Sequence, residues 1–170
     1  SLYLLMQTSL LSFTREGIVR WKFKAQISSV VLSPEGLVYV LISRSDGRSP
    51  GLYALDPNGK NPFGTRVWYE PLWLGGGSGE YATAVMGTGD LLYCMNDPLS
   101  FLAFDRDGSP QWAFELGFQM NIPSMAVGRD GSVYLFTGEA LYAVSRHGSL
   151  QWSKVLTLIY PILFPFMEFP

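Results

Sequence analysis

The residues best suited to chemistry are few and lie far apart in the chain. Its 170 residues include one cysteine, Cys94, and one histidine, His147. A single cysteine excludes an internal disulfide framework and a cysteine-rich zinc site. A single histidine excludes any site that needs two, and it argues against a histidine-based catalytic triad. Cys94 stands in an apolar run, so we expect a buried and inert thiol.

Two short segments have the composition of ligand-binding loops. Residues 75–79 read Gly-Gly-Gly-Ser-Gly, but a phosphate loop needs Gly-Lys-Ser/Thr at the start of a helix. Asp105 and Asp107 resemble the opening of a calcium loop, yet the further ligands and the closing glutamate are missing. We therefore interpret the first segment as a linking loop and the second as a hairpin turn. The sequence predicts no catalytic, cofactor-binding or metal-binding residue.

The composition is that of a chain with much to bury. Hydrophobic residues make up 48% of it and charged residues 15%, against about 25% charged in average proteins. The net charge is −2, and no run of lysine or arginine supplies the basic face that a nucleic acid requires. We expect one folded domain over residues 1–170 and no nucleic-acid partner.

The two ends of the chain carry few signals. The start has no basic flank and is interrupted by polar residues at 7–9, so it does not read as a signal peptide. It also lacks an initiating methionine, which favours a processed or excised piece. Residues 155–170 are apolar but contain Pro161 and Pro165, and they are shorter than the ~20 residues of a spanning helix. We predict no transmembrane segment; the tail is a strand with an irregular end, or a contact for a partner or membrane.

One pattern recurs along the chain. Residues 101–112 contain an apolar run, an acidic turn closed by Gly108, and a tryptophan four residues after that glycine. The pattern returns at residues 10–21 and 141–152, and with a five-residue insertion at 52–68. Trp112 and Trp152 are 40 residues apart. Four short strands in about 40 residues are typical of a propeller blade.

The elements around this pattern are strands and turns. Apolar runs rich in Val, Tyr, Phe and Leu are bounded by Gly, Asp, Asn and Pro, without helical period. We predict an all-β propeller with three complete four-stranded blades and a split or partial fourth blade. The complete units are residues 28–74, 81–116 and 124–155, and the partial blade joins 2–24 with 161–164. Either this joining closes a four-bladed ring, or the chain is an arc of a propeller of about seven or eight blades.

The repeat resembles the quinoprotein-type, or PQQ-like, β-propeller repeat. The resemblance is carried by LYALD at residues 52–56, DGSVY at 130–134 and LYAV at 141–144, and it covers about residues 10–155. Thr14 and Ser145 replace the usual aspartate. The Gly-His and Trp-Asp pairing of WD40 repeats is absent. The resemblance implies a propeller similar to the non-catalytic assembly factors of bacterial envelopes, and hence a periplasmic or extracellular location.

We interpret the recurring residues as structural. The glycines close hairpins, and the tryptophans offer flat surfaces for packing between blades. The predicted repeat positions are Trp21, Trp68, Trp112, Trp152, Gly17, Gly59, Gly108, Gly148, Tyr39, Tyr93 and Tyr134.

These features predict a non-catalytic scaffold without a cofactor, which binds a protein partner or self-associates through its incomplete blades. The alternative is a fragment of a quinone-dependent dehydrogenase, or of another cofactor- or carbohydrate-binding propeller. Enzymes of the resembled group have a full ring, acidic calcium ligands and usually adjacent cysteines. This chain has no Cys-Cys pair, so we expect it not to be an enzyme.

Overall fold

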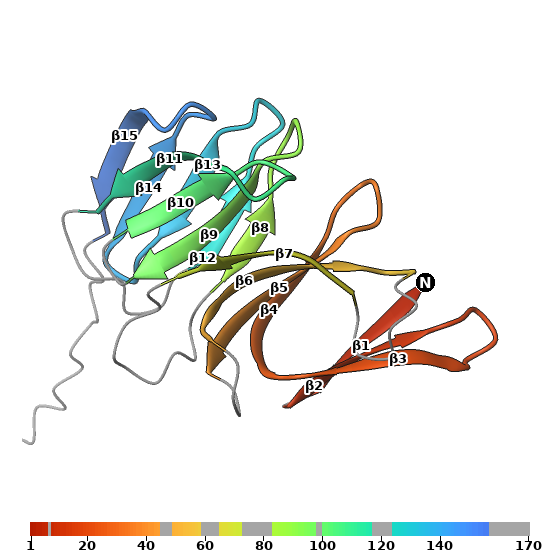
Figure 1. Ribbon diagram of the computed structural model, residues 1–170. Helices are drawn as coiled ribbons and strands as arrows, with labels where there is room; N and C mark the ends of the chain where they lie inside the picture. The colour runs from red at the N-terminus through yellow and green to blue at the C-terminus, as the bar shows by residue number, and fades with distance from the viewer. Residues whose placement is uncertain are drawn as a thin grey trace, which may run out of the picture.

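The computed structural model describes residues 1–6, 8–44, 49–58, 65–72, 83–97, 100–116 and 124–156. Within these ranges the chain forms β-strands joined by turns and contains no helix (Figure 1). This outcome follows from the short runs of branched and aromatic residues, which favour the pleated and half-buried surface of a sheet. Within each sheet, strands that are consecutive in sequence pair antiparallel.

The first sheet has three strands in the order β1-β2-β3. The strands are β1 (Leu2–Met6), β2 (Ser9–Phe13) and β3 (Val19–Lys24).

Three further sheets have four strands each. The second sheet contains β4 (Gln26–Leu32), β5 (Val38–Arg44), β6 (Gly51–Asp56) and β7 (Thr65–Pro71). The third contains β8 (Ala84–Met86), β9 (Leu92–Asp97), β10 (Ser100–Phe104) and β11 (Pro110–Glu115). The fourth contains β12 (Ser124–Val127), β13 (Val133–Phe136), β14 (Ala140–Val144) and β15 (Leu150–Val155).

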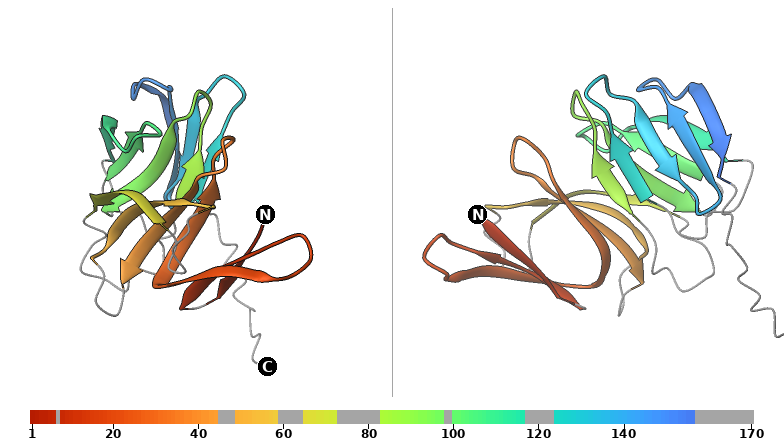
Figure 2. Two further views of the ribbon diagram at one scale, coloured as in Figure 1. Left: turned by 45° about the vertical axis from the view of Figure 1, so that its right-hand side comes forward. Right: turned by 180° about the vertical axis from the view of Figure 1, so that it is seen from behind.

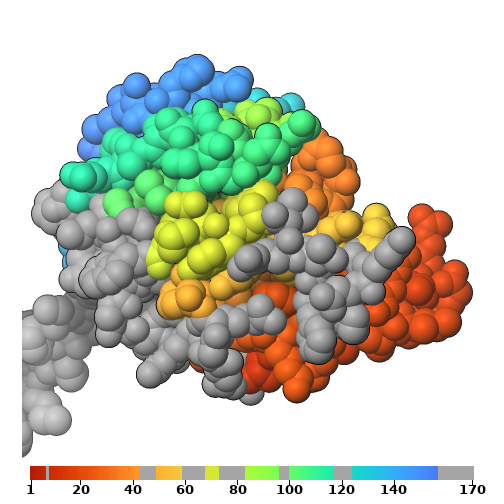
Figure 3. Space-filling model, viewed as in Figure 1, coloured from red at the N-terminus to blue at the C-terminus, as the bar shows by residue number. Residues whose placement is uncertain are grey.

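The four sheets follow one another in an open arc. The first sheet and the fourth sheet lie at opposite ends of the array in all three ribbon views (Figures 1 and 2). The space-filling view shows the same succession, from the first sheet in red to the fourth in blue (Figure 3). The described strands therefore do not close into a ring.

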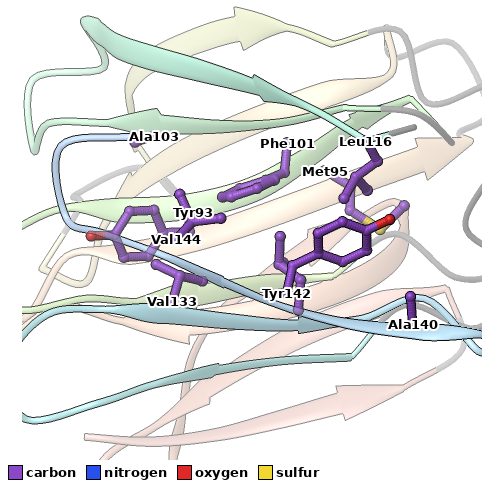
Figure 4. Close-up of a cluster of buried hydrophobic side chains, with 10 residues drawn as sticks. Tyr93, Met95, Phe101, Ala103, Leu116, Val133, Ala140, Tyr142 and Val144 are labelled. Atoms are coloured by element: carbon purple, nitrogen blue, oxygen red, sulfur yellow. The ribbon is translucent and has the colours of Figure 1, made fainter. Parts of the chain in front are cut away.

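The core is divided into three clusters, each between two consecutive sheets. One cluster joins the first and second sheets, one the second and third, and one the third and fourth. We call the contact between two consecutive sheets a joint. At the joint of the third and fourth sheets, Tyr93 and Phe101 face Val133, Tyr142 and Val144 (Figure 4). Such face-to-face packing of small twisted sheets is the architecture of a propeller.

The predicted fold class is confirmed: the chain is all-β, with three complete four-stranded blades and one partial blade. The assignment of residues 1–170 to a single domain stays a prediction. The segment 161–164, which we expected to complete the partial blade, lies outside the described residues.

Candidate interaction site

A row of three residues crosses each sheet at the same place. A tyrosine on the second strand of a blade pairs with a small residue on the third, which pairs with the tryptophan on the fourth. The rows are Tyr3–Ser12–Trp21, Tyr39–Ala54–Trp68, Tyr93–Ala103–Trp112 and Tyr134–Ala143–Trp152. In every row the two rings pack together, with centroids 5.5 to 6.1 Å apart.

Three of the four tryptophans connect their own sheet to the next one. The indole Nε1–H of Trp21 donates a hydrogen bond to the carbonyl oxygen of Pro57 at 3.1 Å. Trp68 donates in the same way to Arg106 at 2.8 Å, and Trp112 to Arg146 at 2.8 Å. The three acceptors hold one position in equivalent hairpin turns, because each stands two residues before the glycine of its turn.

The glycine of the receiving turn makes room for the indole. A Cβ atom at Gly108 would lie 2.7 Å from the nearest ring carbon of Trp68, and one at Gly148 would lie 2.8 Å from Trp112. Both glycines also have positive φ angles, 84° and 83°, which other residues adopt at a cost. The joints of Trp68 and Trp112 therefore each consist of a tryptophan lying against a glycine and hydrogen-bonded to a carbonyl two residues earlier.

The first polar residue of each turn holds the turn together. The carboxylate of Asp105 accepts hydrogen bonds from the backbone N–H groups of Asp107 and Ser109, at 3.0 and 2.9 Å, and from the Gln111 side chain. Thr14 and Ser145, which depart from the usual aspartate, use hydroxyl oxygens to accept from the turn N–H groups instead. The acidic segment at 105–108 is accordingly built as a hairpin turn.

Trp152 differs from the other three because no described sheet packs against its face of the fourth sheet. Its side chain is 44% exposed, whereas Trp21 is 3% exposed. Among the described residues, its indole N–H has no hydrogen-bond acceptor. The outer face of the last described blade thus carries a largely exposed tryptophan, a difference from the expected packing of all four tryptophans between blades.

The opposite end of the arc is uncovered too. Leu2 and Leu4 of β1 are 64% and 50% exposed, although the matching residues of β5, Val38 and Val40, are fully buried. A Cβ at Gly17 would meet no atom within 4 Å, because no preceding tryptophan stacks on this turn. The two ends therefore present the two halves of a joint.

The chemically distinctive residues are not brought together. Cys94 is fully buried, and burial raises the pKa of its thiol, which opposes a nucleophilic or ligand role. His147 is exposed in the turn of the last blade. Within the described ranges, no three His, Cys, Asp or Glu side chains form a group that could hold a metal ion. Gly59 and the loop 75–79 lie outside the described residues.

The described surface has hollows beside the joints. One of about 340 Å³ is lined by Trp112, Arg146 and His147 with Gly89, Leu91 and Gln111. A second, of about 290 Å³, lies beside Trp21 and Pro57. Neither contains an acidic pair that could act as acid and base. In the described part of the chain, no helix has the length and apolar character needed to cross a membrane.

Two features of the joints were missed in the sequence. Tyr3 occupies the same row position as the three predicted tyrosines, and the match between residues 2–6 (LYLLM) and 38–42 (VYVLI) was the signal for it. The acceptors at Pro57, Arg106 and Arg146 are backbone carbonyls, so no side-chain pattern marks them.

Comparison with solved structures shows the class of fold. BamB from Moraxella catarrhalis matches with a TM-score of 0.60 and 18% identity, over 92% of this chain and 48% of that one. Virginiamycin B lyase from Staphylococcus aureus matches with a TM-score of 0.66 and 12% identity, over 88% and 49%. BBS1N, in a structure with ARL6DN, matches with a TM-score of 0.57 and 13% identity, over 91% and 50%.

These likenesses define the chain as a β-propeller. The resemblance seen in its repeats, to quinoprotein-type propellers such as the envelope assembly factors, is confirmed at the level of the fold. The chain spans about half the length of these solved structures. No protein-family model and no curated protein sequence matches it.

Proposed function

We propose that this chain is a non-catalytic β-propeller scaffold that binds another polypeptide, with the free edge of β1 as the binding strand. The observation that carries the proposal is the contrast between β1 and β5. Both are the second strand of a blade and hold apolar residues at five matching positions. In β5, residues 38–42 are 0–1% exposed, because β4 pairs with its edge and neighbouring sheets cover its faces.

The matching residues of β1 are accessible. Leu2, Leu4, Leu5 and Met6 are 45–64% exposed, and no described strand pairs with the outer edge of β1. An unpaired edge presents backbone N–H and C=O groups that an incoming strand can satisfy. The exposed leucines add apolar area to the hydrogen bonds. An extended segment of a partner would complete the blade as β4 completes the second sheet.

The structural likenesses support both this proposal and one alternative. BBS1N is a neighbour whose structure was solved with another protein, ARL6DN, which favours a propeller that binds proteins. Virginiamycin B lyase is a structural neighbour that is named as an enzyme. This likeness favours the alternative, a fragment of a catalytic or cofactor-binding propeller. The likeness to BamB supports a periplasmic or extracellular site of action as part of the same proposal.

The proposal is tested with a strand that already pairs with a β1-like edge in this chain. A soluble peptide copying Gln26–Leu32, the sequence of β4, is added to the full chain, and amide hydrogen exchange is followed by mass spectrometry. We expect saturable binding and at least tenfold slower exchange over residues 2–6, on the order of the protection that one paired edge supplies.

Two controls make the result specific. A peptide of the same composition in scrambled order should give no protection, because its apolar residues no longer stand at the register positions that β4 uses opposite β5. The variant Leu4→Asp places a charge on the strand and should abolish binding while β4–β15 keep their exchange rates. Unchanged exchange in β1 at saturating concentrations of the β4 peptide would contradict the proposed function.

A further inference from the structure

The three joints inside the chain have the same two parts. We call the sheet that contributes the tryptophan the giving side, and the next sheet, which contacts it, the receiving side. The giving side supplies a tryptophan, and the receiving side supplies a turn whose carbonyl accepts the indole N–H. In the second and third joints, Gly108 and Gly148 of that turn lie under the ring. Beside the turn, the receiving sheet supplies a pair of buried apolar residues. These pairs are Val38 and Val40, Leu92 and Cys94, and Val133 and Leu135, all 0–1% exposed.

The turn at residues 14–17 has the geometry of the receiving turns. The φ angle of Gly17 is 82°, against 84° and 83° at Gly108 and Gly148. The Gly17 N–H donates to the Thr14 carbonyl at 3.2 Å, as the Gly108 N–H donates to Asp105 at 3.1 Å. The carbonyl at the acceptor position belongs to Arg15. This turn thus has the geometry of the receiving turns although no described tryptophan packs on it.

The sheet beside that turn has the matching apolar pair. Leu2 and Leu4 stand at the register positions of Val38 and Val40, and they are 64% and 50% exposed. We call this surface, formed by Leu2, Leu4 and the Gly17 turn, the receiving face.

The other end of the chain has the giving half of a joint. Trp152 packs against Tyr134 with ring centroids 6.1 Å apart, as Trp112 packs against Tyr93. It is nevertheless 44% exposed. We call this surface of the fourth sheet, formed by Tyr134 and Trp152, the giving face.

We propose that two copies of this chain associate head to tail, with the giving face of each on the receiving face of the other. Trp152 of one copy stacks on Gly17 of the second and donates its Nε1–H to the Arg15 carbonyl. The inference rests on the proposed function, in that the second copy is the partner, but it uses the blade faces rather than the edge of β1.

Closure of the pair follows from the two complementary faces. Each copy contributes four described sheets and has both a giving face and a receiving face, so two copies form two joints of the same kind. Heterologous contacts close into a ring when the rotation between subunits permits it, and a closed ring leaves no blade face uncovered.

The test is the mass of the full chain in solution, measured by light scattering and analytical ultracentrifugation over a range of concentrations. We expect a species of twice the 18.9 kDa of one chain. Trp152→Ala removes the giving side chain and should raise the dissociation constant at least about tenfold, as truncating a central tryptophan of an interface does.

A second variant acts on the receiving face. Gly17→Asn places a side chain where the free chain has open space, and asparagine tolerates positive φ better than most residues. In a joint like those of Gly108 and Gly148, the new Cβ would collide with the incoming ring. We expect this variant to fold and to be monomeric, so the test does not depend on the stability of the Trp152 variant.

Matched controls separate the joint from general effects. Gly36→Asn introduces the same residue at another positive φ, 96°, where the nearest atom is 3.9 Å away, and should leave the pair intact. Val155→Ser removes a side chain that is 69% exposed on the other face of β15, and should also leave it intact. A mixture of the Trp152→Ala and Gly17→Asn chains retains one intact joint and should form a 1:1 complex.

The inference is overturned if the parent chain is a monomer at all accessible concentrations, if it forms open filaments, or if Gly17→Asn associates as strongly as Gly36→Asn. None of these results removes the proposed function, because binding of the β4 peptide to the edge of β1 is measured separately. If the chain forms the dimer but the β4 peptide does not bind to the edge of β1, the inference about self-association stands and the proposed function is contradicted.

Discussion

Two buried tyrosine hydroxyls show how the repeat works at the scale of the residue. In the described part of the chain, the hydroxyls of Tyr39 and Tyr93 are buried without a hydrogen-bond partner. Burial, with a smaller contribution from the charge of Glu35, raises the pKa of Tyr39 to about 12. The rings pack against Trp68 and Trp112. Because the rings are buried in the joints, their hydroxyls are buried too.

Tyr39→Phe tests this reading. Because an unsatisfied buried hydroxyl costs free energy, its removal should leave the free energy of unfolding at pH 8 unchanged or raise it by up to about 1 kcal/mol. A pKa that is higher in the folded state contributes stability below the ordinary value of 10.0, and this contribution is lost as pH rises towards 12. The variant should therefore lose less stability than the parent between pH 9 and about pH 11.

Urea unfolding at pH 8 measures the change in stability, and urea unfolding at pH 9 and about pH 11 measures its pH dependence. Tyr134→Phe, at the same repeat position in the uncovered last blade, is the matched control. A loss of more than about 2 kcal/mol at pH 8 on Tyr39→Phe would show that the hydroxyl has a partner and would contradict the interpretation.

At the scale of the element, the hairpin turn before the tryptophan strand is the unit that each blade repeats. Asp105 accepts three hydrogen bonds within its turn, and Ser145 accepts two in the equivalent turn. Bonds to an ionised acceptor are stronger than bonds to a neutral hydroxyl. The threonine and serine that replace the usual aspartate thus preserve the shape of the turn, but the hydrogen bonds that they accept are weaker.

Ser145→Asp should stabilise the last blade. The new carboxylate would accept from the N–H groups of His147 and Ser149, and we expect a gain of about 0.5–1 kcal/mol, or roughly 1–4 °C in Tm. The converse change, Asp105→Ala, should cost about 1–2 kcal/mol. Differential scanning calorimetry at pH 7 checks both.

The pH dependence supplies the control for this pair. The advantage of Ser145→Asp requires an ionised carboxylate, so it should disappear as pH falls below about 4. An equal gain at pH 3 and pH 7 would show that the effect does not come from the turn hydrogen bonds.

At the scale of the whole molecule, the proposed scaffold and the alternative, a catalytic fragment, differ in the quinone and calcium binding that they predict. Quinone-dependent propeller enzymes need acidic ligands around a central axis, and within the described residues the acidic side chains do not gather into a group that could hold a cation. Titration of the full chain with pyrroloquinoline quinone and calcium, followed by calorimetry and a dye-linked alcohol oxidation assay, should show neither stoichiometric binding nor turnover. Tight binding with turnover would replace the scaffold proposal by its alternative.

The sequence alone determined the fold of this protein. The spacing from turn glycine to tryptophan and the 40-residue interval between repeats predicted four-stranded units, and the sheets match that prediction. This was possible because alternation and turn chemistry are local: Asp105 and Gly108 shape their hairpin whatever surrounds it. The partial blade was also readable, although Tyr3 was overlooked as the first member of its row.

Only the tertiary structure decided how the blades are joined and where the joints are vacant. The tryptophans look alike in sequence, yet Trp21 is 3% exposed and Trp152 is 44% exposed. The acceptor of the indole N–H of Trp21, Trp68 and Trp112 is a backbone carbonyl between 34 and 38 residues further along the chain, and every residue has a backbone carbonyl. Whether a face is covered depends on the neighbouring blade and not on its own residues, so position in the arc, rather than residue type, distinguishes a packed tryptophan from a candidate binding surface.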